Sequence, residues 1–397
     1  MSAAPAPDTP RLSGLHYLDH AATSAVRPAV VAREMARYLD EVGATPGRGG
    51  HRLALEAGRL VLQARRSVCR VLGLPGDPGR LVFGLNATHG LNLALQGVLR
   101  SGDAVVVTAF DHNAVLRPVH RLGRERGVEV RMVNGEADGS LDRDGFRSAV
   151  DGARLVVLNA VSNVLGSRLP VAELTAEAHR AGALVLVDTA QAGGHVPVAL
   201  HDADLVAFTG HKGLLGPQGV GGLWVRQGLE VEPLLLGGTG GDSRRREMPL
   251  ALPDALEAGT LNGPGIAGLR AGCETVLEEG VPTIHSRLKD LKQRLRDGLM
   301  SIPAVRVLSP PAPQGAGIVT LVPRRGDPGS LAHRLDREHG VLGRAGLHCA
   351  PEAHRLLGTL ETGALRLSVG WATTNLDVDR ALEAVDRSVR PRSISVL

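Results

Sequence analysis

The chain has 397 residues, of which 43% are apolar and 22% charged, so it can bury a large core and is expected to form two domains. Its formal net charge is +4 and most arginines are scattered singly, so we expect no nucleic-acid partner. No apolar run approaches the roughly 18 residues that span a bilayer, and residues 1–10 lack the pattern of a signal peptide. These features predict a cytoplasmic protein without a membrane segment.

Short apolar runs alternate with helix-patterned stretches from about residue 80 onward. The predicted strands are 81–83, 104–108, 128–133, 155–159, 184–188 and 205–208. They are nearly continuous in valine and leucine, which is typical of strands covered by helices on both faces of a mainly parallel sheet. The central segment is therefore predicted to be α/β.

A Gly-, Arg- and Pro-rich stretch at 237–253 is predicted to be a long loop, and a helical pattern follows at 263–280. Strand patterns at 305–308, 317–322 and 364–369, with helices between and after them, indicate a smaller α+β domain. We place the domain boundary near residue 257. The expected division is an N-terminal segment 1–16 packing on the small domain, a large domain 17–256, and a small domain 257–397.

Lys212 lies in a Gly-rich turn after an apolar strand, which is an unusual place for a lysine. A Schiff-base lysine needs a confined site that favours the neutral amine, although a surface lysine fits the same turn. Asp188 ends the preceding apolar strand and is either a carboxylate for a cofactor's pyridine nitrogen or a turn cap. The strand-to-helix junction at 83–92 could bind a phosphate, because helix N-termini offer free N–H groups. Alone, Thr88 in that junction could be only an N-cap.

Several motifs occur together in one order along the chain. They are YLDHAAT (17–23), PGRGGH (46–51), DHNA (111–114), SNVLG (162–166), VDTAQA (187–192), GHK (210–212), EAGTLN (257–262) and RAGLHCA (344–350). In these motifs the sequence resembles the class-V aminotransferase-fold family and, within it, the cysteine desulfurases of the SufS-like group. The resemblance implies a pyridoxal 5'-phosphate (PLP) enzyme of fold type I, with a mainly parallel seven-stranded sheet covered by helices. No metal site is expected.

The same resemblance assigns site residues. Lys212 would hold PLP as a Schiff base, Asp188 would pair with its pyridine nitrogen, and His112 would stack on the ring as a catalytic residue. The other implied cofactor contacts are Asn163 and Gln191 near the ring's 3-oxygen, and Ala87, Thr88, Thr209, His211 and Thr260 at the phosphate. Thr260 would come from the partner subunit, which implies a homodimer. Arg366, with Arg344 and Asn163, would bind the substrate, because Arg geometry suits a carboxylate.

The cysteines Cys69, Cys273 and Cys349 are odd in number and widely spaced, which argues against a disulfide framework. Cys69 and Cys273 lie in helical patterns and are expected to be buried small hydrophobes. Cys349 lies in a Gly- and His-rich turn and is the catalytic candidate. The resulting hypothesis is a cysteine desulfurase that converts L-cysteine to L-alanine and leaves a Cys349 persulfide. A protein acceptor would then take the sulfur, for instance for iron–sulfur cluster assembly.

Two alternatives stay open. A selenocysteine lyase, an aminotransferase or an epimerase of the same fold would use the same cofactor, with Cys349 auxiliary or idle. A non-catalytic scaffold of this fold would show damaged cofactor positions, whereas the positions named above are intact.

Overall fold

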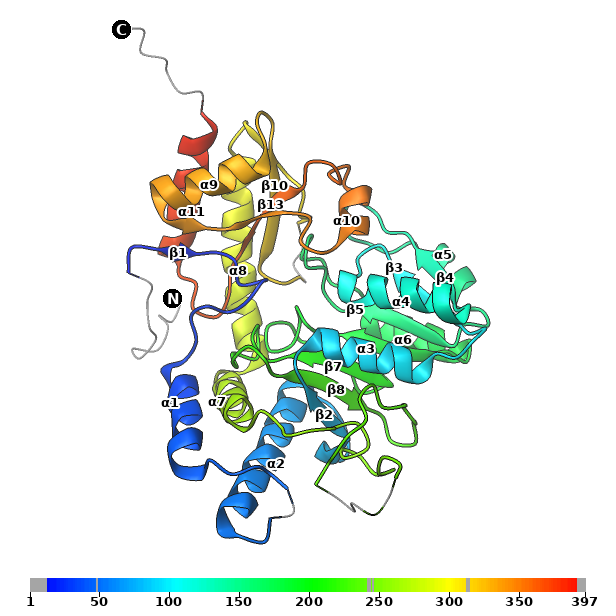
Figure 1. Ribbon diagram of the computed structural model, residues 1–397. Coiled ribbons are helices and arrows are strands. Elements are labelled where there is room, and N and C mark those ends of the chain that lie inside the picture. Colours follow the sequence, from blue (N-terminus) through cyan, green and yellow to red (C-terminus); the bar gives the residue numbers. More distant parts are fainter. Residues whose placement is uncertain (1–12, 48, 241–243, 245, 312–314, 391–397) are drawn as a thin grey trace, which may run out of the picture.

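The computed structural model describes residues 13–390 except 48, 241–243, 245 and 312–314. Its largest element is a seven-stranded sheet with the strand order β2-β8-β7-β6-β5-β3-β4 (Figure 1). The strands are β2 (Leu81–Gly84), β3 (Ala104–Thr108), β4 (Glu129–Val133), β5 (Leu155–Asn159), β6 (Leu184–Asp188), β7 (Leu205–Thr209) and β8 (Gly221–Val225). β3 to β7 are mutually parallel, whereas β8 is antiparallel to both of its neighbours. The expected mainly parallel sheet is confirmed.

The strands are apolar along their whole length because both faces of the sheet are covered. Val105 and Val107 point to a core cluster with α3 (Ala87–Val98) and α4 (Asn113–Arg126). The intervening Val106 belongs to a second cluster on the other face, with α2 (Arg52–Leu72), α5 (Arg143–Val150) and α6 (Val171–Arg180). Alternate residues of one strand thus serve two cores.

The smaller part of the chain is built on a four-stranded antiparallel sheet of order β12-β13-β10-β9. Its strands are β9 (Val305–Val307), β10 (Ile318–Pro323), β12 (Arg344–Gly346) and β13 (Ala364–Ser368). The helices α8 (Val281–Met300), α9 (Pro328–His339) and α11 (Asn375–Val389) accompany this sheet, and the short α10 (Pro351–Leu356) follows Cys349. The expected α+β character of this region is confirmed.

The N-terminal part of the chain crosses between the two sheets. β1 (His16–Tyr17) pairs in parallel with β11 (Val341–Leu342) beside the small sheet. After α1 (Ala29–Arg37) come the π-helical turn η1 (Tyr38–Val42) and, beyond α2, the 3₁₀ turn η2 (Pro78–Arg80). α7 (Gly263–Glu279) packs against α1 and α2.

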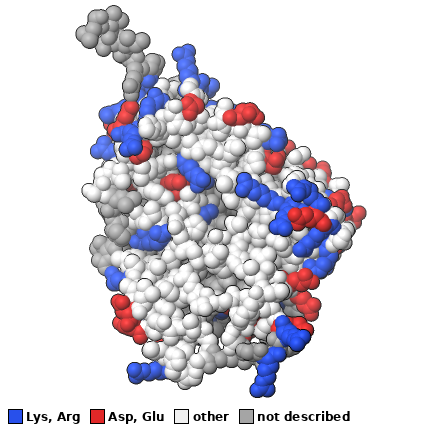
Figure 2. Space-filling view, in the orientation of Figure 1, with Lys and Arg blue, Asp and Glu red and all other residues white. Residues whose placement is uncertain are grey.

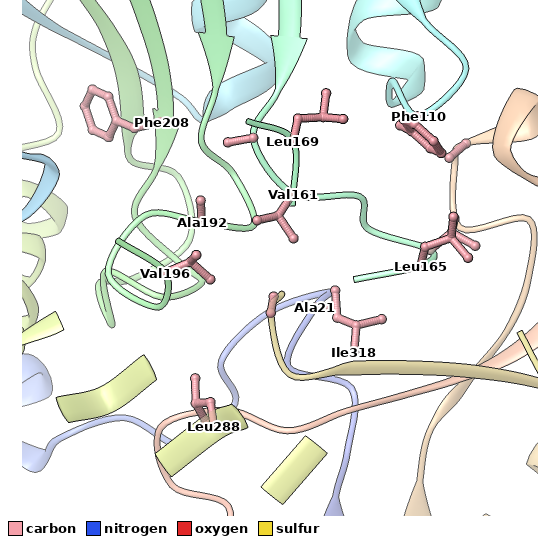
Figure 3. Packing of buried hydrophobic residues seen from close by; sticks show 14 of the residues in the cluster. Ala21, Phe110, Val161, Leu165, Leu169, Ala192, Val196, Phe208, Leu288 and Ile318 are labelled. Carbon is pink, nitrogen blue, oxygen red and sulfur yellow. The ribbon is translucent and has the colours of Figure 1, made fainter. Parts of the chain in front are cut away.

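One continuous core joins the two parts. Phe208 of β7 and Val161 lie in the same cluster as Leu288 of α8 and Ile318 of β10 (Figure 3). A shared core fixes the orientation of the small sheet relative to the large one. The domain boundary near residue 257 therefore stays a prediction, because the segments on its two sides pack around one shared core. None of the described helices is long and apolar enough to cross a bilayer.

Candidate active site

Most of the predicted site residues line one cavity of about 220 Å³. It lies where β3, β5, β6 and β7 end, which is the edge at which open α/β sheets bind ligands. The predicted residues in its wall are Ala87, Thr88, His112, Asn163, Asp188, Gln191, Thr209, His211, Lys212, Arg344, Cys349 and Arg366. Thr260 is the exception, because it is exposed and does not line this cavity.

Lys212 and Asp188 come from the ends of adjacent strands. β6 ends at Asp188 and pairs with β7, and Lys212 follows β7 by three residues. Burial lowers the pKa of Lys212 from its usual 10.5 to about 8, and Asp188 opposes this effect. Burial raises the pKa of Asp188, whereas the N–H of Ala190, which donates to its Oδ1 at 2.8 Å, and the charge of Lys212 act against it. The neutral amine of Lys212 is therefore accessible near neutral pH.

The turn that carries Lys212 is held by residues near the N-terminus. Ser24 donates its N–H to the carbonyl of His211 (2.9 Å) and its hydroxyl to that of Lys212 (3.0 Å). The hydroxyl of Thr23 donates to the His211 carbonyl and lies 3.0 Å from His211 Nδ1. Arg27 donates to the carbonyl of Gly216 (2.9 Å). These contacts fix the backbone on both sides of the lysine.

The start of α3 forms one end of the cavity. Asn86 is its N-cap and accepts the N–H of His89 (3.0 Å), while Ala87 and Thr88 open the helix beside the cavity. The first N–H groups of a helix have no intrahelical partner, and the helix dipole favours an anion there. Thr209 lines the same cavity, and its Oγ1 is buried without a hydrogen-bond partner among the described residues. This end is therefore suited to a phosphate group.

His112 and Asn163 lie along the cavity wall. His112 caps α4, because its Nδ1 accepts the N–H of Ala114 (3.0 Å). Burial and the charge of Lys212 lower the pKa of His112 to about 4, so the ring is neutral at physiological pH. Asn163 donates from Nδ2 to the carbonyl of His348 (2.6 Å), and its Oδ1 is buried without a partner among the described residues.

Gln191 and Arg366 have protein partners that the sequence did not indicate. Gln191 donates from Nε2 to the carbonyl of Ala21 (2.9 Å). Arg366, only 2% exposed, donates from Nη2 to Asp19 (2.8 Å) and from Nη1 to the carbonyl of Asn163 (3.1 Å). Its Nε is left without a partner among the described residues. A ligand carboxylate that binds Arg366 would therefore share the guanidinium with Asp19.

Cys349 is the exposed cysteine, whereas Cys69 and Cys273 are buried as expected. Burial raises the pKa of the Cys69 thiol to about 12 and that of Cys273 further, so neither is a nucleophile in the folded protein. Cys349 and His348 both adopt left-handed backbone conformations, with φ of 58° and 50°. This region costs about 1–2 kcal/mol for each residue other than glycine. The backbone around the thiol is therefore held by its surroundings.

Part of that support is a buried chain of hydrogen bonds behind Cys349. His348 Nε2 lies 3.0 Å from the carbonyl of Arg344, which can only accept, so Nε2 carries the proton. His348 Nδ1 must then accept from His354 Nε2 (3.2 Å), and His354 Nδ1 accepts from the hydroxyl of Thr359 (2.8 Å). Burial lowers the pKa of His348 to about 3 and that of His354 to about 4, so both rings are neutral.

Sequence reasoning missed two parts of this site. Asp19 lies within a motif that was recognised, yet its pairing with Arg366 joins positions far apart in the chain. The series of hydrogen bonds from His348 through His354 to Thr359 leaves no pattern in the sequence beyond the local density of histidines. Spacing cannot show which of these side chains is buried.

Comparisons with known proteins cover nearly the whole chain. Residues 16–381 match the aminotransferase class-V family. A protein of Methanothermobacter thermautotrophicus, named a probable cysteine desulfurase, is 36% identical over 388 residues, which is 96% of each chain. The apo structure of a cysteine desulfurase from Thermococcus onnurineus superimposes with a TM-score of 0.88 at 31% identity and 94% coverage of both chains. The Escherichia coli cysteine desulfurase CsdA, in an S-sulfonic acid form, gives a TM-score of 0.85 at 28% identity and 96% coverage of both.

Proposed function

We propose, since this chain belongs to the aminotransferase class-V family and is homologous to its cysteine desulfurases, that it is a PLP-dependent cysteine desulfurase. In this proposal it converts L-cysteine to L-alanine and retains the sulfur as a persulfide on Cys349. The observation that carries it is the shared cavity, which has Lys212 and Asp188 in its wall together with the exposed Cys349.

The unpaired polar groups of the cavity fit PLP. The free N–H groups at the start of α3 and the unpartnered hydroxyl of Thr209 suit its phosphate. The unpartnered Oδ1 of Asn163 and the carboxyl of Asp188 line the same cavity and suit the polar atoms of its ring. When bound, PLP supplies an electron sink for a carbanion at the substrate's Cα.

The residues around the ring would divide the remaining work. Lys212, with its pKa near 8, would remove the Cα proton as a neutral amine. Asp188 would hold the proton of the pyridine nitrogen, and its burial strengthens that hydrogen bond. The neutral ring of His112 can pack on a flat ligand without adding charge.

Arg366 and Cys349 would act on the substrate itself. Arg366 would bind the carboxylate, aided by the exposed Arg344 at the cavity wall. The Cys349 thiolate would form a bond to the substrate sulfur as the Cβ–Sγ bond breaks. The electron pair of that bond stays on Cβ, which then takes up a proton, so cysteine and a thiol yield alanine and a persulfide without an external oxidant.

We extend the proposal to a homodimer in which Thr260 completes the phosphate site of the partner subunit. Thr260 is exposed, and the segment before it is anchored by Glu257, which pairs with Arg65 (2.7 Å) and accepts the N–H of Phe83 (2.5 Å). A fixed, exposed Thr260 is therefore available to a second copy. A protein sulfur acceptor, a cytoplasmic location and a role in iron–sulfur cluster assembly belong to the same proposal.

The decisive experiment is turnover of L-cysteine by the purified, PLP-loaded protein, with alanine and sulfide both measured. We expect Cys349→Ser to lower alanine formation at least about 100-fold, because it removes the nucleophile. The absorption spectrum of the bound cofactor should stay unchanged, since Cys349 does not hold the cofactor in this proposal.

Cys69→Ala is the matched control, because it removes a buried thiol that takes no part in the reaction. It should turn over L-cysteine at close to the unmodified rate. Undiminished turnover in Cys349→Ser would contradict the persulfide mechanism. Turnover of L-selenocysteine that survives this change, with no turnover of L-cysteine, would favour a selenocysteine lyase instead.

A further inference from the structure

A second groove, of about 660 Å³, lies between α4 and the edge strand β4, outside the catalytic cavity. Its apolar residues are Leu116, Val119, Val128, Val130 and Met132. Val130 is 37% exposed and Met132 is 42% exposed, and both stand on β4, which among the described strands pairs with β3 alone. Exposed apolar side chains beside a free sheet edge are a common mark of a surface that another chain covers.

The charged residues around this groove are mostly basic. Arg117, His120 and Arg124 line it from α4, and the acidic residue among its lining, Glu352, is paired with Arg355 (2.9 Å). Within the part of the chain that the structure describes, neither Arg117 nor Arg124 has an ion-pair partner. On the side of the molecule where α4 and β4 lie, basic and acidic side chains are interspersed (Figure 2), so the basic character belongs to the lining of the groove itself. The groove is therefore complementary to an acidic partner.

The groove is continuous with the loop that carries Cys349. Its wall includes Pro351 and Glu352, which open α10 two and three residues after the cysteine. The N–H of Asn113, the first residue of α4, donates to the carbonyl of Cys349 (2.7 Å), and the groove begins at Leu116, about one helical turn further on. A polypeptide lying in the groove would thus pass close to the cysteine.

We propose that this groove docks the protein that takes sulfur from Cys349, and that this partner presents an acidic segment with an apolar centre and a thiol. The proposal rests on the proposed function for the persulfide alone. In the transfer, the partner's thiolate attacks the outer sulfur of the Cys349 persulfide. The S–S bond breaks, Cys349 leaves as a thiolate, and a persulfide forms on the partner, so no oxidant or reductant is needed.

Two synthetic peptides of equal length are suitable probes. Both have a Leu-Ile-Cys-Val centre, flanked in one by glutamates and in the other by lysines. Binding is measured by fluorescence anisotropy with the cysteine replaced by serine, so this measurement needs no persulfide. We expect the acidic peptide to bind about tenfold more tightly than the basic one at low ionic strength, and the difference to shrink as salt screens the charges.

Arg124→Glu should abolish this preference, because it reverses a charge at the groove. Arg121→Glu is the matched control, since Arg121 is an exposed arginine of the same helix that pairs with Glu125 and does not line the groove. Met132→Ser should weaken binding about threefold or more at every salt concentration, because apolar contacts are not screened.

A second measurement follows sulfur transfer from protein loaded with L-cysteine to the two cysteine-containing peptides and to dithiothreitol. The acidic peptide should react about tenfold faster than the basic one in the unmodified protein and in Arg121→Glu, but not in Arg124→Glu. Transfer to dithiothreitol should be equal in all three proteins.

Three outcomes would overturn the proposal. The two peptides could bind equally, or Arg124→Glu and Arg121→Glu could lose the preference for the acidic peptide to the same extent. In the third outcome, sedimentation would show that Met132→Ser weakens the dimer. The last would assign the groove to a contact between two copies of this chain. Absence of any persulfide with L-cysteine would instead refute the proposed function, while the anisotropy measurement would still test the groove.

Discussion

His354 does not line the cavity, yet it hydrogen-bonds to His348, the residue before Cys349. Its Nε2–H is the donor to His348 Nδ1. Replacing it with asparagine leaves a buried acceptor unsatisfied, at a cost of about 1–3 kcal/mol. That cost is comparable to the strain of the two left-handed residues, so the loop should relax. We expect His354→Asn to lower kcat for L-cysteine about tenfold with KM changed less than twofold.

The rate at which iodoacetamide alkylates Cys349 in the cofactor-free protein is the independent readout, and it should change in the same variant. Thr359→Ser keeps the hydroxyl that donates to His354 Nδ1 and should behave like the unmodified protein, whereas Thr359→Val should not. An alkylation rate and a kcat that both stay the same in His354→Asn would show that the conformation of the Cys349 loop does not depend on these hydrogen bonds.

The individual residues were predictable where a motif carried them. Lys212, Asp188, His112 and Cys349 come from motifs whose chemistry is specific, and the structure brings them to one cavity. The sequence could not show the burial or the protonation state of each group. The lowered pKa of Lys212 follows from burial, and burial is a property of the folded chain.

The position of α3 depends on glycines where the helix meets β8. A Cβ on Gly90 would lie 2.3 Å from the carbonyl oxygen of Gly222, so the helix and strand backbones are nearly in contact. Gly90→Ala should push the start of α3, which would hold the phosphate in the proposed function, away from β8 and lower the free energy of unfolding by about 1–3 kcal/mol. Binding of inorganic phosphate to the cofactor-free protein should weaken as well, which isothermal titration would measure.

Gly58 in α2 provides the matched control, because a Cβ there meets no atom within 4 Å. Gly58→Ala should stabilise the protein by up to about 1 kcal/mol, since alanine favours the helix. If both substitutions had the same effect, the close approach of α3 to β8 would not be what positions the helix.

At the level of elements, the bounds of strands rich in valine and leucine were predicted to within a residue or two, as in β3 and β6. β8 was missed. It begins with Gly221 and Gly222, which resemble the end of a turn, and its glycines are needed because side chains there would collide with neighbouring backbone. A strand that begins with glycines, because neighbouring backbone lies close to it, lacks the apolar pattern by which strands are recognised.

For the whole molecule, the α/β and α+β parts were predicted in the right order, but the single core that joins them was not predicted. That core forms because loops after the large sheet meet α8 and β10, and such contacts depend on side chains distant in sequence. The same limit applies to the ion pair between Asp19 and Arg366, which ties an N-terminal segment to the small sheet.

A core with several buried neutral histidines should be sensitive to acid. Burial lowers the pKa of His20 to about 3, of His195 to about 4 and of His348 to about 3, against 6.5 ordinarily. Between about pH 4 and 6.5 the unfolded chain therefore binds more protons at these sites than the folded one, and stability falls as the pH falls. His112, His211 and His354, whose pKa values burial lowers to about 4, add to this effect. Asp111, whose pKa burial raises to about 8, and Asp188, whose pKa burial also raises, act in the opposite direction.

The net expectation is a free energy of unfolding that decreases as the pH falls across this window, because the buried histidines outnumber the two carboxyls and each uncompensated proton contributes about 1.4 kcal/mol per pH unit. Urea unfolding followed between pH 6.5 and 4.5 measures the slope. His20→Gln should reduce it by about one proton, while His333→Gln, at an exposed position on α9, is the matched control and should not. A stability that stayed level over this range would mean that the histidines are protonated in the folded protein, and the neutral hydrogen-bonded chain behind Cys349 could then not be correct.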